Sequence, residues 1–97
     1  MKIEFRRSGG LAGLSVRLAL DSAVLPPGER EALEALIARA RFFELPERRS
    51  SVHPDAFLYD LAIEREGRRH AISLGDRDAP AELKPLLERL IEMARTR

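Results

Sequence analysis

The stretch FLYDLAIEREGRRHAISL, residues 57–74, decides the fold. Apolar side chains occupy every second position on both sides of the pair Glu66-Gly67, and His70 falls in the same register. The alternating side chains are Phe57, Tyr59, Leu61, Ile63, Ile72 and Leu74. A period of two is that of a strand with one buried face, and a short break that contains glycine is typical of a hairpin turn. The stretch therefore predicts two antiparallel strands joined by a tight turn.

The N-terminal segment carries the same alternation. Apolar residues recur at every second position over residues 1–7 and again over residues 16–20. Between them lie residues 8–14, with the sequence SGGLAGL, which hold three of the six glycines of the chain. We therefore expect another hairpin, whose two strands are connected by a glycine-rich loop.

A helix is predicted over residues 27–41. It would begin at Pro27, which suits the first helical turn because the N–H that proline lacks is not needed there. Apolar residues then recur at helical spacing, and they are Leu33, Leu36, Ile37 and Ala40. We expect this stripe to face the sheet.

A terminal helix is predicted after Pro80. Its apolar stripe consists of Leu83, Leu86, Leu87, Leu90, Ile91 and Ala94. Pro85 inside a helix that started at Pro80 would remove a hydrogen bond and crowd the preceding turn, at a cost of ~3 kcal/mol. We expect either a kink at Pro85 or a short first turn before a main helix that begins there.

The order strand, strand, helix, strand, strand, helix in a chain of 97 residues predicts a single domain, residues 1–97. Because hairpins pair their strands antiparallel, the predicted fold class is α+β, with a four-stranded antiparallel sheet and two helices on one face. Residues 47–55, with the sequence ERRSSVHPD, are polar and lack periodicity. They are expected to form a loop more mobile than the strands.

Composition narrows the classes of partner. Seventeen basic residues against sixteen acidic ones give a formal net charge of +1, which argues against bulk attraction to nucleic acid or to anionic lipid. Arginine doublets at 6/7, 48/49 and 68/69 could form a basic patch, but most aromatic residues fall at predicted core positions, where they cannot stack on bases. No apolar run reaches the ~20 residues of a membrane span. We expect a soluble cytoplasmic protein that binds neither nucleic acid nor membrane.

No arrangement of residues for catalysis is evident. The chain has no cysteine, and the spacing of His53 and His70 matches no metal motif. His70 is expected to be a hydrogen-bonded side chain at a sheet edge or core margin. None of the six serines lies in a GxSxG motif, and the glycine-rich loop leads into a strand, whereas a phosphate-binding loop needs a helix. We predict a protein that is not an enzyme and has no metal site or cofactor of its own.

The glycine-rich loop is the unusual feature that remains. Three glycines within residues 9–13 lose much backbone entropy on folding, which favours a special conformation or a close approach by another molecule. Leu11 lies between them. Its side chain either folds back over the end of the sheet or projects as an anchor into the pocket of a partner.

Four stretches together resemble the emfourin family, over nearly the whole chain. They are KIEFRRSGGLAGL (2–14), FFELP (42–46), PDAFLYDLAIEREGRRHAISL (54–74) and PAELKPLLERL (80–90). Emfourins are small bacterial protein inhibitors of protealysin and related thermolysin-like metallopeptidases. The resemblance implies an inhibitor that occupies the active-site cleft of a zinc peptidase, with the zinc belonging to the target and no cofactor in this chain.

The candidate partner-binding residues form one segment. They are Ser8, Gly9, Gly10, Leu11, Ala12 and Gly13, which include the most specific part of the resemblance. An alternative hypothesis is a non-inhibitory protein–protein interaction module that binds an unknown partner through this loop or a sheet edge. Inhibition of a thermolysin-like peptidase would separate the two.

Overall fold

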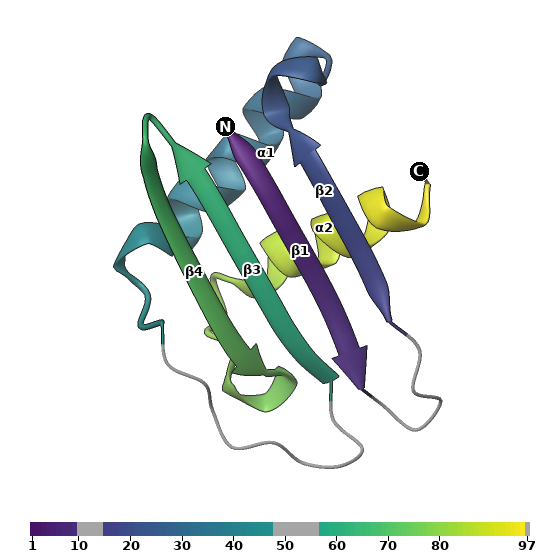
Figure 1. The fold of residues 1–97 in the computed structure, drawn as a ribbon, viewed down its shortest axis with the longest axis vertical. Helices are drawn as coiled ribbons and strands as arrows, with labels where there is room; N and C mark the ends of the chain where they lie inside the picture. The colour runs from purple at the N-terminus through teal and green to yellow at the C-terminus, as the bar shows by residue number, and fades with distance from the viewer. Residues whose placement is uncertain (10–14, 48–56, 97) are drawn as a thin grey trace.

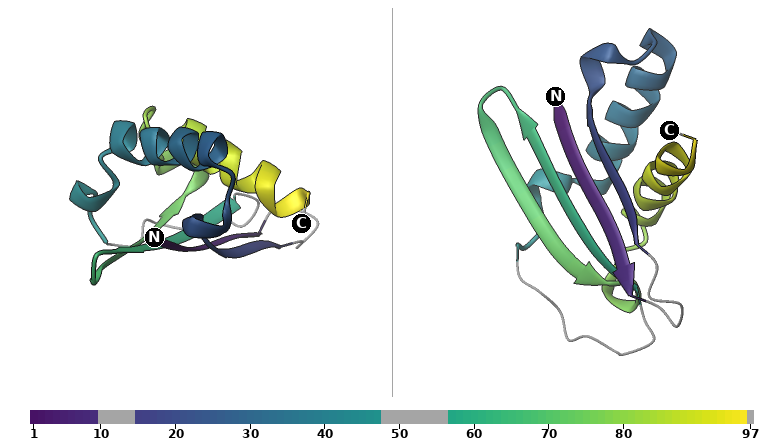
Figure 2. Two further views of the ribbon diagram at one scale, coloured as in Figure 1. Left: turned by 90° about the horizontal axis from the view of Figure 1, so that it is seen from above. Right: turned by 45° about the vertical axis from the view of Figure 1, so that its right-hand side comes forward.

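The computed structural model describes residues 1–9, 15–47 and 57–96. Its sheet consists of β1 (Lys2–Gly9), β2 (Val16–Asp21), β3 (Phe57–Arg65) and β4 (Arg68–Gly75), in the spatial order β2-β1-β3-β4. All neighbouring strands are antiparallel. Two helices, α1 (Pro27–Ala40) and α2 (Lys84–Arg95), cover one face of this sheet (Figures 1 and 2). The predicted α+β fold, with both helices on one side, is confirmed.

Both predicted hairpins are present. The second turns at Glu66 and Gly67, whose φ angles of 52° and 78° are both left-handed. This is the backbone of the hairpin turns that match the twist of paired strands, and the predicted tight turn is therefore confirmed. The first hairpin joins β1 to β2, and β1 also pairs with β3 along its whole length.

A left-handed residue ends the first helix, and proline fixes the start of the second. α1 ends at Ala40, and the residue that follows it, Arg41, adopts a left-handed conformation with φ 52°. Before α2, the backbone N–H of Leu83 donates to the carbonyl of Pro80 at 3.0 Å, which closes a separate short turn. Pro85 then lies in the first turn of α2, where its missing N–H is not needed. Of the two expectations for Pro85, the short first turn is correct.

The core lies between the sheet and the helix layer. The helices contribute Leu33, Ile37, Leu86, Leu87, Leu90 and Met93, and the turn before α2 contributes Leu83. The sheet contributes Ile3, Phe5, Leu18, Tyr59, Leu61, Ile63 and Ile72. Leu36, predicted on the stripe of α1, is only partly buried at the margin of this core. The predicted mobile loop at residues 47–55 lies, from residue 48 onward, outside the described residues.

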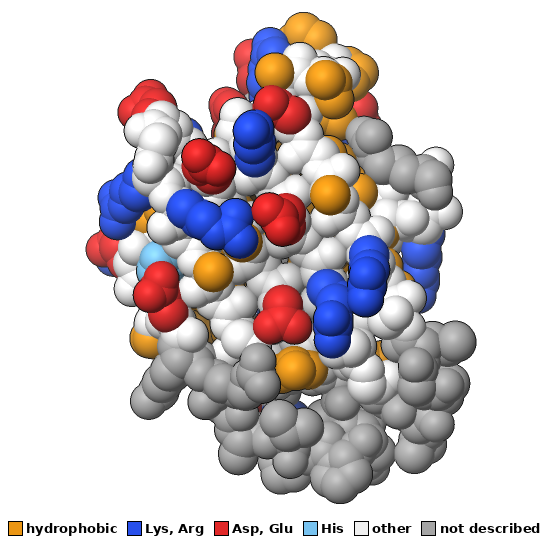
Figure 3. Space-filling model, in the orientation of Figure 1, with side chains coloured by type: hydrophobic (Ala, Val, Ile, Leu, Met, Phe, Trp, Pro, Cys, Tyr) orange, Lys and Arg blue, Asp and Glu red, His pale blue; other side chains and the backbone are white. Residues whose placement is uncertain are grey.

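No described helix covers the other face of the sheet (Figure 2). On that face, shown in Figure 3, acidic and basic side chains are spread among exposed backbone, and apolar side chains remain scattered over the strands. We call it the open face.

Candidate functional site

The predicted partner-binding segment begins at the end of a central strand. Ser8 and Gly9 are the last two residues of β1, and both are half-buried. The remaining predicted residues, Gly10, Leu11, Ala12 and Gly13, lie outside the described residues. The two expectations for the side chain of Leu11 therefore both remain predictions.

Gly9 supplies the special backbone conformation that the glycine-rich sequence led us to expect. Its φ angle is 93°, in a region that residues with a Cβ atom rarely adopt. Gly9 is still paired across the sheet with Phe57 of β3. The sheet thus holds the first glycine in a backbone conformation that favours glycine.

The strands on both sides of β1 hold the residue that precedes the segment. Arg7 pairs with Val16 of β2 on one side and with Tyr59 of β3 on the other. The guanidinium of Arg7 also lies 4.4 Å from the ring centroid of Phe57, within the range of a cation–π contact. The strand that leads into the segment is therefore held by both neighbours and by a side-chain contact.

Tyr59, the partner of Arg7 on β3, connects this end of the sheet to the turn before α2. Its hydroxyl donates to Oδ1 of Asp76 at 3.1 Å, in the 3₁₀ turn η3 (Asp76–Asp78) that leads towards α2. Burial, followed by the negative charge of Asp76, raises the pKa of Tyr59 above its ordinary value of 10.0. The phenol is therefore a neutral donor at physiological pH.

His70 lies at the core margin, as predicted, with a side chain that is 14% exposed. Its Nε2 is 2.7 Å from the carbonyl oxygen of Leu45, and its Nδ1 is 3.5 Å from Oε1 of Glu47. The ring packs edge-on against Phe42 with centroids 5.3 Å apart. These contacts make His70 a structural link between β4 and the segment after α1.

The described residues hold no cluster of three or more side chains suited to a metal ion. His53 lies outside them. Nothing in the described ranges therefore assigns a metal role to either histidine.

The open face carries two rows of residues that cross all four strands. Within each row, the residues are partners on neighbouring strands from β4 to β2. The polar row is Ser73, Asp60, Arg6 and Arg17, and the alanine row is Ala71, Ala62, Glu4 and Ala19. Because the alanine side chains are short, a groove of about 620 Å³ runs over this part of the sheet, lined by both rows, Arg69 and Glu47.

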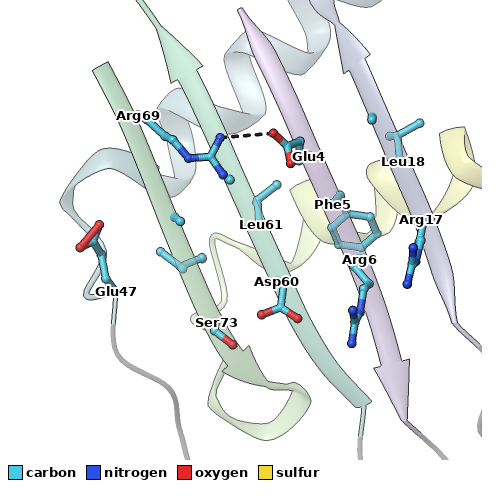
Figure 4. Close-up of a pocket in the computed structure, with 14 residues that line it drawn as sticks. Glu4, Phe5, Arg6, Arg17, Leu18, Glu47, Asp60, Leu61, Arg69 and Ser73 are labelled. Atoms are coloured by element: carbon cyan, nitrogen blue, oxygen red, sulfur yellow. Dashed lines mark hydrogen bonds and ion pairs between the residues drawn. The ribbon is translucent and has the colours of Figure 1, made fainter. Parts of the chain in front are cut away.

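Charges in the groove are paired at one place and unpaired at another. Nη1 of Arg69 lies 3.3 Å from Oε1 of Glu4 (Figure 4), so this cation is neutralised across β3. Among the described residues, Arg6 and Arg17 have no carboxylate oxygen within 4.0 Å, although Asp60 is the neighbour of Arg6 in the polar row. The end of the groove over β1 and β2 is therefore positively charged.

A family model described as Emfourin matches residues 5–91. The chain belongs to the emfourin family. Emfourins are protease inhibitors at the level of the family. No curated protein and no solved structure matches the chain. The resemblance to emfourins that the sequence showed is thereby confirmed.

The matched region of this emfourin contains the whole predicted segment Ser8–Gly13, the first hairpin from Phe5 onward, the whole second hairpin and most of α2. No helix in the described ranges is long and apolar enough to cross a membrane.

Sequence reasoning did not find the pair formed by Arg6 and Arg17. The doublet Arg6-Arg7 is visible in the sequence, but Arg17 can be placed beside Arg6 only when the register of the first hairpin is known.

Proposed function

We propose that this emfourin inhibits thermolysin-like zinc metallopeptidases of the protealysin type by occupying their active-site cleft. The observation that carries the proposal is the family match over residues 5–91. In this proposal the zinc belongs to the peptidase, the emfourin is not an enzyme, and the two proteins meet in the bacterial cytoplasm.

The inhibitory segment is proposed to be Ser8–Gly13. Three features support it: the segment leaves a central strand, β3 pairs with its first two residues, and Gly9 has a left-handed backbone. A segment whose ends are fixed loses less conformational entropy on binding, and this favours affinity. Fixed ends also keep the two halves of a cut chain together, so the bond can be resealed.

Leu11 is proposed as the anchor of the segment. Thermolysin-like enzymes favour a bulky apolar side chain just after the scissile bond, and Leu11 follows Gly10 directly. The glycine would let the inhibitor backbone pass close to the catalytic zinc. A buried apolar anchor of this kind typically contributes most of the energy of an interface.

The test measures peptide hydrolysis by a purified thermolysin-like peptidase at increasing inhibitor concentration. Leu11→Asp is expected to weaken inhibition by about 2 to 4 kcal/mol, or roughly 30- to 1000-fold, with a melting temperature close to that of the wild type. Val24→Asp is the matched control, because Val24 is a 73% exposed apolar residue after β2, at the opposite end of the sheet. It should leave inhibition unchanged.

Three results would count against this proposal. No inhibition by the wild type at micromolar excess contradicts the function itself. Full inhibition by a folded Leu11→Asp variant contradicts the anchor. A lower melting temperature, with inhibition reduced only in proportion to unfolding, would show that Leu11 packs on the end of the sheet.

A further inference from the structure

Arg6 and Arg17 form an exposed pair of like charges. They are direct partners on β1 and β2, and both side chains project from the open face. Figure 4 shows them side by side, extending along the strands towards the end at which β1 finishes. Like charges directly opposite each other in an antiparallel pair destabilise the sheet. The repulsion between Arg6 and Arg17 is therefore unfavourable to the fold, and only Arg6 has an acidic cross-strand partner, Asp60, on its other side.

Two arginines of the described chain take part in ion pairs. Arg69, on the same face, is paired with Glu4, and Arg89 in α2 contacts Glu29 and Glu92. Most other described arginines, like Arg6 and Arg17, have no carboxylate oxygen within 4.0 Å.

A second pair of arginines faces each other across two strands, but its surroundings differ. Arg65 and Arg68 are direct partners on β3 and β4, and both guanidiniums lie over the ring of Phe43. Arg6 and Arg17 instead line the groove of the open face, where two adjacent guanidiniums are available for a ligand that brings its own negative charge.

The position of the pair determines what such a ligand can be. Arg6 precedes Ser8 by two residues, and Arg17 follows the first residue of β2, so both flank the segment proposed to enter the cleft. Arg7, on the core side of the same strand, adds a third positive charge at this end. The surface beside the inhibitory segment therefore carries these three positive charges, with Asp60 as the acidic neighbour of Arg6.

We propose that Arg6 and Arg17 bind an acidic surface segment of the target peptidase, beside the cleft that Ser8–Gly13 occupies. This inference rests on the proposed function and adds the chemistry of the partner surface. Carboxylates of the peptidase lie over the two guanidiniums, and the groove over Ala19 and Ala62 accommodates the backbone that carries them. Exposed complementary charges at the rim of an interface mainly accelerate association, and salt screens them.

The test compares association and dissociation rate constants with a purified thermolysin-like peptidase over a range of salt concentrations. The double variant Arg6→Gln, Arg17→Gln should associate roughly 10-fold more slowly at low salt, with a dissociation rate within about twofold of the wild type and a weaker salt dependence. Its melting temperature should stay close to that of the wild type, because the lost repulsion between the guanidiniums offsets the lost attraction between Arg6 and Asp60.

The control is Arg30→Gln, Arg39→Gln in α1, on the side of the molecule away from the open face. Both double variants change the formal net charge from +1 to −1, since each removes two positive charges. The control should associate at nearly the rate of the wild type. An equal loss in the control would assign the effect to net charge and overturn the proposal.

Two further results would also overturn it. One is an association rate that does not change in the Arg6→Gln, Arg17→Gln variant while the wild type inhibits normally. This result would leave the proposed function intact. The other is a lowered melting temperature with a reduced active fraction, which would make the pair structural. If the wild type does not inhibit any thermolysin-like peptidase, the proposed function and this inference fail together.

Discussion

One hydroxyl group joins the sheet to the turn that leads into the second helix. Tyr59 donates to Asp76 at 3.1 Å, and its ring stacks on Phe5 with centroids 6.3 Å apart. It is also the only tyrosine of the chain. Its ionisation can therefore be followed without interference from other phenols.

Tyr59→Phe should lower the free energy of unfolding at pH 7 by about 0.5 to 1.5 kcal/mol, because it removes one hydrogen bond and keeps the ring. The pKa of Tyr59 is raised in the folded state. The stability that the neutral phenol contributes is therefore fully present below pH 10.0 and is lost as the pH rises through the raised value. Denaturant unfolding at several pH values should show the difference between wild type and variant shrinking above pH 10.0.

The backbone of Gly9 allows a second prediction for a single residue. At φ 93°, a Cβ atom would be strained, and Gly9→Ala should lower stability by about 1 to 2 kcal/mol. Gly28→Ala is the matched control, because nothing lies within 4 Å of the added Cβ in α1. It should raise stability by about 0.4 to 1 kcal/mol. Opposite shifts of the melting temperature are expected, and shifts of the same sign would contradict the strain at Gly9.

At the scale of elements, the periodicity of the sequence predicted the strands and helices well. Periods of two and of 3.6 gave both hairpins and both helices, with bounds that differ from the structure by a few residues. Local rules left two expectations for Pro85, and the structure shows the short first turn. Met93 was missed because it lies at the edge of the stripe of α2, yet it is 6% exposed. Burial at such edges depends on the neighbouring element, which periodicity does not describe.

Only the part of the candidate site that consists of consecutive residues could be predicted from the sequence. The glycines of the first loop can be read directly from the sequence, and Gly9 has the conformation they suggested. The polar row cannot be read in this way, because it joins Ser73, Asp60, Arg6 and Arg17 from four strands. Likewise, the partner of His70 is the carbonyl of Leu45, 25 residues away. Contacts of this kind depend on strand order and register.

The packing of the helices on the sheet can be tested with two leucines that differ in burial. Leu87 is 4% exposed, and Leu87→Ala should destabilise the protein by about 2 to 5 kcal/mol through lost burial and a cavity. Leu36 is only partly buried at the core margin, so Leu36→Ala should cost about half as much or less. Denaturant titration of both variants measures the difference. Equal costs would mean that α1 packs more deeply than the structure shows.

At the scale of the molecule, the segment Ser8–Gly13 depends on distant parts of the chain. β1 lies between β2 and β3, and the helices cover the face that buries Ile3 and Phe5. A two-stranded hairpin alone is marginally stable in water. The loop therefore needs the rest of the domain to hold its ends.

A synthetic peptide of residues 1–21 tests this dependence, because it contains the entire first hairpin. It should show no stable β structure by circular dichroism, and it should inhibit the peptidase at least about 1000-fold more weakly than the full chain, since it must be ordered on binding. A cyclised form of the same peptide is the control and should recover part of the inhibition. Comparable inhibition by the linear peptide would show that the scaffold is dispensable.

The central place of the first strand has a consequence for the order of events on the ribosome. β1 is made first, but its partner β3 ends only at Arg65. At about 5 to 20 residues per second, roughly 3 to 11 s separate the synthesis of Gly9 from that of Arg65. During this interval the nascent chain already carries its glycine-rich segment without the sheet that constrains it. A protease acting on nascent chains would therefore meet this segment as ordinary substrate, and resistance to cleavage would arise only when β3 has paired with β1.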